Sequence, residues 1–187
     1  MTEGKDQPEL VPQDGIGVDD ALARLWTPHR MAYIVGAAEA NGAEDESCPF
    51  CRIPSMSDEE GLLLARGRQV YAVLNLHPYN PGHLMVVPYR HVGGLEDLTE
   101  AEALELTAMT RDAVRAIKKA SSPHGFNVGL NLGGVAGGSL ADHLHQHVVP
   151  RWGGDANFIT VLAQTKVIPQ LLSETRALIA EAWPTSD

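Results

Sequence analysis

Three of the eight histidines fall within five residues, as His143-Leu-His145-Gln-His147. If this segment is a β-strand, alternate residues share one face, so the three imidazole rings project together. Because each polar ring needs a hydrogen-bond partner, a purely structural role in a core is the weakest interpretation. Two kinds of chemistry fit better. Alternate histidines could surround a zinc ion, or one imidazole could attack phosphorus while its neighbours orient it and donate protons.

A glycine-rich stretch, Asn131-Leu-Gly-Gly-Val-Ala-Gly-Gly-Ser139, precedes the three histidines. Backbone amides of glycines can approach an anion closely, and the Ser139 hydroxyl adds a donor. Taken alone, the stretch is explained equally well by a turn. Directly before a histidine cluster, it favours a phosphate-binding loop and therefore covalent catalysis at phosphorus.

A second group of potential ligands is Cys48-Pro-Phe-Cys51, which contains both cysteines of the chain. Two cysteines cannot form a disulfide framework, and their spacing is typical of metal or redox chemistry in a reducing compartment. The pair could be half of a zinc site, or simply two buried cysteines. A thioredoxin-like role would require a surrounding βαβ pattern, which the sequence does not show.

The elements that must position these residues follow from hydrophobic periodicity. Alternation predicts strands over 69–76 and 83–87, and the Pro- and Gly-containing turn between them predicts an antiparallel hairpin. Thr99 and Glu102 form a capping box, after which apolar residues at every third or fourth position predict a helix to about Ala120. Further strands are expected over 126–132 and 143–150, and a C-terminal helix over 165–183, with Pro169 the place where it would break. This order predicts an α+β fold with a mainly antiparallel sheet.

Length and charge narrow the classes of function. The 187 residues suit one domain, expected over 21–187, after an acidic tail at 1–20 that has too few apolar residues to fold. The formal net charge of -10 argues against a nucleic-acid partner. No apolar run is long enough to span a membrane, and the N-terminus lacks the apolar region of a secretory signal. A cytoplasmic location is therefore expected.

The residues His143-Leu-His-Gln-His-Val-Val149 resemble the His-φ-His-φ-His-φ-φ signature of the histidine triad (HIT) superfamily of nucleotidyl hydrolases and transferases. Gln146 is the one departure, since it is polar where φ is hydrophobic. Asn75 and Pro81-Gly-His83 resemble the ribose-binding asparagine and the fourth histidine of that superfamily. The matches run from about Cys48 to Trp152 and imply the histidine triad fold. Leu25-Trp-Thr-Pro-His-Arg30 and His147-Val-Val-Pro-Arg-Trp152 further resemble an actinobacterial branch, the diadenosine tetraphosphate phosphorylases.

The resemblance implies a role for each matching histidine. His145 is the expected nucleophile, which attacks an α-phosphate and forms an adenylyl-histidine. It must be neutral to attack, so its other ring nitrogen needs an acceptor that fixes the tautomer. His147 is the expected donor near the leaving group, and His83 and His143 are expected to complete the orienting network.

Substrate-binding residues are also implied by the resemblance. Asn75 is expected on the ribose hydroxyls, with turn capping as its alternative. The residues expected around the phosphates are Asn131, Gly137, Gly138 and Ser139. Trp152 could stack on adenine or be buried in packing. Many hydrolases of the superfamily carry Gln where Ser139 stands, which leads to the hypothesis that the shorter side chain admits inorganic phosphate in place of water.

The implied function is phosphorolysis of diadenosine tetraphosphate to ATP and ADP by double displacement through adenylyl-histidine. The alternatives with the same intermediate are a dinucleoside polyphosphate hydrolase and a nucleoside phosphoramidase. The alternatives of another class are a zinc-dependent hydrolase and a non-catalytic nucleotide-binding module. The expected partners are a dinucleoside polyphosphate and inorganic phosphate, and a second copy in a homodimer with joined sheets, or a tetramer.

No cofactor is expected to be required for the chemistry, but the resemblance implies a structural zinc site. Its ligands would be Cys48, Cys51, His91 and His143. Because one ring cannot both bind zinc and act as a free proton donor, a bound zinc would give His143 a structural role.

Overall fold

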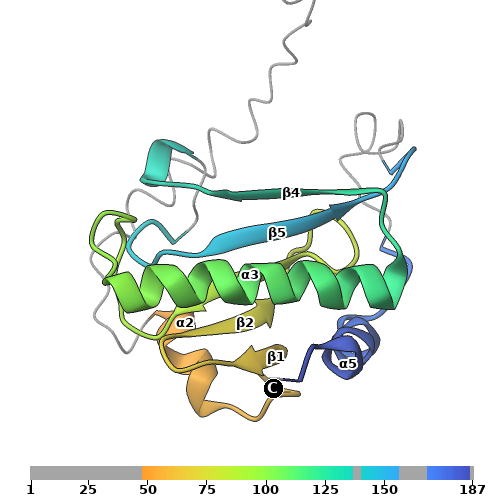
Figure 1. Ribbon diagram of the computed structural model, residues 1–187, viewed down its shortest axis with the longest axis horizontal. Coiled ribbons are helices and arrows are strands. Elements are labelled where there is room, and N and C mark those ends of the chain that lie inside the picture. The colour runs from red at the N-terminus through yellow and green to blue at the C-terminus, as the bar shows by residue number, and fades with distance from the viewer. Residues whose placement is uncertain (1–47, 137–139, 156–167, 186–187) are drawn as a thin grey trace, which may run out of the picture.

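The computed structural model describes residues 48–136, 140–155 and 168–185 (Figure 1). The expected tail at 1–20 and the loop residues 137–139 lie outside these ranges. Five strands form one sheet in the order β1-β2-β3-β5-β4, and every neighbouring pair is antiparallel. The strands are β1 (Leu63–Arg66), β2 (Val70–Leu74), β3 (Leu84–Pro88), β4 (Gly125–Leu130) and β5 (Gln146–Arg151). The predicted α+β class with an antiparallel sheet is confirmed.

Helix α3 (Glu100–Ser121) lies across one face of the sheet, and α5 (Leu172–Ala182) lies beside its end (Figure 1). The predicted capping box is present: the Thr99 hydroxyl accepts from the Glu102 amide, and the Glu102 carboxylate accepts from the Thr99 amide. The short helix α2 (Pro49–Arg52) is followed by a 3-10 turn, η2 (Ile53–Ser55), and a second such turn, η3 (Gly134–Ala136), follows β4. Within the described ranges, no helix has both the length and the apolar composition needed to cross a membrane.

Both faces of strand β2 are buried. Val70, Ala72 and Leu74 pack with residues of α3, whereas Tyr71 and Val73 pack in a second cluster with Cys48, Phe50, Met85 and Val87. The alternation predicted for this strand is therefore real, and α2 lies against the face opposite α3. That face is the one on which the cysteine pair meets the histidines.

The fourth predicted strand begins later than its histidine pattern suggested. We expected it from His143, but β5 starts at Gln146, and His143 and His145 lie just before it. The cause is a competing contact: the Leu144 amide donates to the Val92 carbonyl at 2.6 Å rather than to the neighbouring strand. The prediction that all three histidines lie on one continuous strand was therefore wrong, since only His147 lies within β5.

Two further elements differ from expectation. The C-terminal helix begins at Leu172, beyond Pro169, whereas a start at 165 was predicted. Residues 165–167 lie outside the described ranges. The edge strand β1 was not predicted, since its four residues are too few to show a period.

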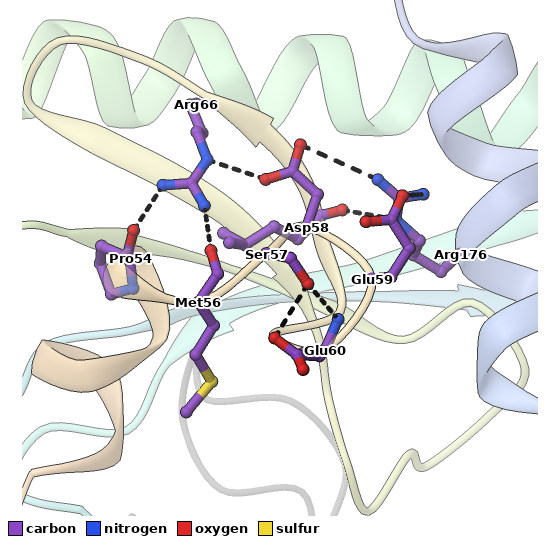
Figure 2. A network of polar contacts seen from close by, with 9 residues as sticks. Pro54, Met56, Ser57, Asp58, Glu59, Glu60, Arg66 and Arg176 are labelled. Atoms are coloured by element: carbon purple, nitrogen blue, oxygen red, sulfur yellow. Dashed lines mark hydrogen bonds and ion pairs between the residues drawn. The ribbon is translucent and has the colours of Figure 1, made fainter.

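A polar network fastens α5 and the segment after α2 to strand β1 (Figure 2). The guanidinium of Arg176 donates from Nε to the Leu63 carbonyl at 2.8 Å and from a terminal nitrogen to Glu59 at 3.2 Å. Arg66 pairs with Asp58 at 2.8 Å and donates to two carbonyls of the segment that follows α2. The network therefore fixes residues 54–59, the segment that follows the cysteine pair, against β1 and α5.

Candidate active site

His145 is held in one tautomer by the backbone. Its Nδ1 lies 2.8 Å from the carbonyl oxygen of His143, which can only accept, so Nδ1 carries the proton and Nε2 keeps its lone pair. The ring is buried against Phe50, with ring centroids 5.0 Å apart. Burial lowers the pKa of His145, although its bond to the His143 carbonyl opposes this. A neutral imidazole with a bare Nε2 is a suitable nucleophile at neutral pH.

A chain of hydrogen bonds gives His147 the opposite tautomer. The Tyr79 amide donates to His83 Nδ1 at 3.0 Å, so His83 carries its proton on Nε2. That atom lies 2.9 Å from His147 Nδ1, which must accept, so His147 carries its proton on Nε2. The side-chain nitrogen of Asn131 lies 3.4 Å from this Nε2, and with the amide flipped its oxygen accepts a hydrogen bond from Nε2–H. His147 is therefore a hydrogen-bond donor in its neutral form.

The turn before β3 positions His83 for this relay. Gly82 has a φ of 77°, a left-handed conformation that glycine adopts without strain, and the His83 amide closes the turn on the Asn80 carbonyl. The Tyr79 ring covers the pair, with centroids 4.6 Å from His83 and 5.9 Å from His147. Burial, helped by the neighbouring imidazoles, lowers the pKa of His83 to about 3 and that of His147 to about 4. Both rings are neutral at pH 7.

A cavity of about 410 Å³ opens beside His147 and runs along strands β4 and β5. Gly129 lies opposite His147 in the strand register, and Gly125 lies opposite Arg151. Since side chains on one face of β5 recur every second residue, His147 and Arg151 mark two ends of this face about 13 Å apart. The volume lies within the range of pockets for small molecules and cofactors. Its lining residues include Tyr79, Asn80, Asn127, Asn131, Val149 and Asp155.

The cysteine pair meets two histidines on the same side of the sheet. Cys48 Sγ lies 3.3 Å from His143 Nδ1, and Cys51 Sγ lies 3.2 Å from His91 Nδ1. One potential ligand atom from each residue lies within 4.8 Å of all the others. His143 Nε2 lies 2.9 Å from the Pro88 carbonyl, so Nδ1 is left with the lone pair that a metal requires. These four residues, Cys48, Cys51, His91 and His143, could hold a metal ion.

His143 connects this cluster to His145. Its ring lies among the cysteines and is 1% exposed, while its backbone carbonyl fixes the His145 tautomer. The side chain is thus engaged with the potential metal ligands and with Pro88, and it acts on His145 through the backbone.

Two of the expected substrate-binding residues, Asn75 and Trp152, do not line the cavity beside His147. The side-chain oxygen of Asn75 accepts from the His77 amide at 2.8 Å, which is the turn-capping contact named as its alternative. Trp152 lines a second cavity, of about 350 Å³, between the end of α3 and α5. Gly137, Gly138 and Ser139 fall outside the described residues.

Sequence reasoning assigned no role to a polar cluster at the far end of the first cavity, although Arg151 lies in the segment 147–152 quoted for the resemblance. Arg151 donates two hydrogen bonds to Asp155, at 2.7 and 2.9 Å, and a third to Asn127 at 2.7 Å. Asn80 also donates to Asp155, at 2.7 Å. The bond from Arg151 is the main cause that lowers the pKa of Asp155. Asn80 could have been suspected only because it lies in the turn that carries Tyr79, and the other three are ordinary surface residues by type.

Comparison with known proteins agrees with this geometry. Residues 59–154 match the HIT domain family. An AP-4-A phosphorylase of Mycobacterium tuberculosis is 63% identical over 172 residues, which cover 90% of this chain and 88% of that protein. A zinc-bound histidine triad family protein from Mycobacterium smegmatis has a similar structure, with a TM-score of 0.59 and 26% identity over 74% of this chain and 94% of its own. A hypothetical histidine triad nucleotide-binding protein from Sulfolobus tokodaii gives a TM-score of 0.59 and 27% identity over 72% of this chain and 91% of its own. The chain therefore belongs to the HIT domain family, and His143, His145 and His147 are its histidine triad.

Proposed function

We propose that this protein is a nucleotidyltransferase that converts diadenosine tetraphosphate and inorganic phosphate to ATP and ADP. The observation that carries the proposal is the pair of opposite tautomers: His145 presents a bare Nε2, and His147 presents an Nε2–H. One ring suits attack on phosphorus and the other suits donation to a departing oxygen. The 63% identity to a protein named AP-4-A phosphorylase supports the choice of substrate and of phosphate as the second reactant.

The first step is an in-line displacement at the α-phosphorus. His145 Nε2 forms a bond to phosphorus while the bond from phosphorus to the bridging oxygen breaks, and ATP leaves as an anion. The His147 Nε2–H donates a hydrogen bond to the oxygens that gain charge. The Nδ1–H of His145 keeps its bond to the His143 carbonyl and so stabilises the positive charge that the adenylylated ring acquires.

The second step reverses the first with a different nucleophile. An oxygen of inorganic phosphate attacks the same phosphorus, the nitrogen–phosphorus bond breaks, and ADP leaves. Asn131, Gly137, Gly138 and Ser139 are the residues that we propose around the phosphates, together with Asn75 at the ribose and Trp152 near the base. Support for Asn131 comes from its amide, 3.4 Å from His147 Nε2.

We also propose that Cys48, Cys51, His91 and His143 hold a structural zinc ion. Two sulfurs and two imidazole nitrogens within 4.8 Å of one another suit its tetrahedral coordination, and the similar M. smegmatis structure is zinc-bound. When bound, zinc would cross-link the α2 segment to the chain before β5. His143 would then have a positioning role rather than that of a proton donor, and metal analysis of the purified protein tests the assignment.

The remaining proposals concern assembly and location. Strand β4 is an edge strand with exposed side chains such as Val128, which supports a homodimer in which two sheets join there. Light scattering of the purified protein would distinguish a dimer from a monomer or a tetramer. A cytoplasmic location suits the two cysteines, which form no disulfide with each other.

Product analysis with and without inorganic phosphate tests the function. With phosphate, we expect ATP and ADP, and intact-mass measurement without phosphate should show an added AMP that His145→Ala does not acquire. Release of AMP and ATP at the same rate whether or not phosphate is present would instead identify a hydrolase. Full activity of His145→Ala would exclude covalent catalysis altogether.

A further inference from the structure

The first cavity lies on the leaving-group side of the proposed nucleophile. His147, whose Nε2–H is the proposed donor to the departing oxygen, lines this cavity, and His145 does not. In an in-line displacement the leaving group departs on the side opposite the nucleophile. The departing arm of the substrate must therefore pass His147 and continue along β4 and β5.

We propose that this cavity binds the leaving nucleoside triphosphate arm, and that Arg151 at its far end gives the enzyme its preference for a long substrate. This inference rests on the proposed function and adds a subsite to it. The span of about 13 Å from His147 to Arg151, four residues of extended strand, is comparable with an extended triphosphate chain and the start of its ribose.

Arg151 has the donors that an anionic arm requires. Three of its five N–H groups are used by Asp155 and Asn127, which leaves one on each terminal nitrogen. Its side chain is 47% exposed, and it is the only cation among the described residues that line the cavity. Because the net charge of the chain is -10, an anionic arm needs a local positive group such as Arg151.

The arrangement around Arg151 holds its guanidinium still before any ligand binds. Asp155, in the chain after β5, and Asn127, on β4, both accept hydrogen bonds from the guanidinium. A ligand therefore does not have to order a mobile side chain when it binds. The Asn127 oxygen is already used by Arg151, so its amide nitrogen supplies a further donor at the cavity wall. A structural explanation is that Arg151 only secures the turn at Asp155, which also accepts from the Trp152 amide. The two explanations predict different dependence on substrate length.

The two explanations for Arg151 can be distinguished with two substrates that leave the same AMP on His145. Diadenosine tetraphosphate releases ATP, which reaches Arg151, whereas ADP releases only inorganic phosphate, which does not. In the reverse of the second step, His145 Nε2 attacks the α-phosphorus of ADP, the bond from that phosphorus to the bridging oxygen breaks, and inorganic phosphate leaves. The rate of AMP attachment, measured by rapid quench and intact mass, therefore gives kcat/KM for each donor.

For Arg151→Ala, we expect kcat/KM with diadenosine tetraphosphate to fall about ten-fold, as for the loss of a charge-assisted hydrogen bond, with little change for ADP. Asn127→Ala should give a smaller loss with the same selectivity. Arg115→Ala is the matched control, since Arg115 also pairs with an aspartate, Asp112, at 2.8 Å but lies on α3. It should leave both rates unchanged.

An equal loss with both donors in Arg151→Ala and Asn127→Ala would overturn the inference, because it would mean that the cluster only supports the fold. Unchanged rates with both donors would overturn it as well. If Arg151→Ala does not fold, Arg151→Lys keeps the charge, and a loss confined to the longer donor would support the inference. Failure of the wild-type protein to acquire AMP from either donor would refute the proposed function, which is a different outcome.

Discussion

Replacing His83 by leucine should test whether a hydrogen-bond relay sets the protonation of His147. His83 is fully buried, and its two ring nitrogens bond to the Tyr79 amide and to His147 Nδ1. Leucine is similar in size but can neither accept nor donate. The change therefore removes the only group in the relay that assigns the proton of His147 to Nε2.

The expected losses of adenylylation rate and of stability follow from the two hydrogen bonds that His83 makes. An intramolecular hydrogen bond contributes about 1 kcal/mol net, and leaving a buried polar group unpaired costs about 1–3 kcal/mol. With the bond to Nδ1 gone, His147 can place its proton on either nitrogen, and we expect adenylylation to slow about ten-fold, which corresponds to about 1.4 kcal/mol. Because the Tyr79 amide also loses its acceptor, the free energy of unfolding should fall by about 2 kcal/mol.

The assay is single-turnover transfer of AMP from diadenosine tetraphosphate, combined with nitrogen-15 spectra of the imidazole groups. The spectra report which nitrogen of His147 carries the proton in each variant. His83→Gln is the matched control, since its amide nitrogen can still donate to His147 Nδ1, and it should stay within about three-fold of the wild-type rate. A rate and a tautomer both unchanged in His83→Leu would show that the relay does not control His147.

Three other predictions concern stability. Because burial lowers the pKa of His83 to about 3 and that of His147 to about 4, the unfolded chain takes up protons first as the pH falls below about 6.5. Stability should therefore be full above that pH and fall below it by up to about 1.4 kcal/mol per pH unit for each ring, measured by denaturant unfolding and compared with a His147→Asn variant. Cys48→Ser should lower the bound metal measured by elemental analysis, together with the melting temperature, and a chelator should reproduce the thermal shift in the wild-type protein alone. Glu102→Gln should lower the free energy of unfolding by about 2 kcal/mol at pH 7, since the carboxylate accepts from Arg90 and Thr99. The pKa of Glu102 is lowered to about 2, mainly by Arg90, so this difference should shrink as the pH falls from about 4.5 toward 2.

The long elements could be predicted because their patterns repeat. Helix α3 shows several turns of apolar spacing after its capping box, and β2 and β3 alternate around a turn rich in Pro and Gly. Strand β1 has only four residues and was missed. The alternation of His143, His145 and His147 predicted a strand from residue 143, but β5 begins only at Gln146, and the Leu144 amide bonds to the Val92 carbonyl instead. Tertiary contacts overrode the local pattern there.

The sequence also pointed to the residues of the site but not to the tautomer of each imidazole ring. Spacing identified the three triad histidines and the cysteine pair, and the resemblance added His83 to the site and His91 to the potential ligands. Which ring nitrogen carries each proton depends on the carbonyls of Pro88 and His143 and on the Tyr79 amide. Every residue type has such backbone groups, so no side-chain pattern could have revealed them.

The three histidines of the triad illustrate how hydrogen bonds give residues of one type three different protonation patterns. The Pro88 carbonyl accepts a hydrogen bond from His143 Nε2–H, which leaves the Nδ1 lone pair facing the cysteines. The His143 carbonyl accepts a hydrogen bond from His145 Nδ1–H, which leaves the lone pair on Nε2. His83 donates to His147 Nδ1, which leaves a donor at Nε2. The His143 backbone bonds to the proposed nucleophile, His145, while the His143 ring joins the potential metal ligands. A change at Cys48 should therefore reach His145 through that single peptide group.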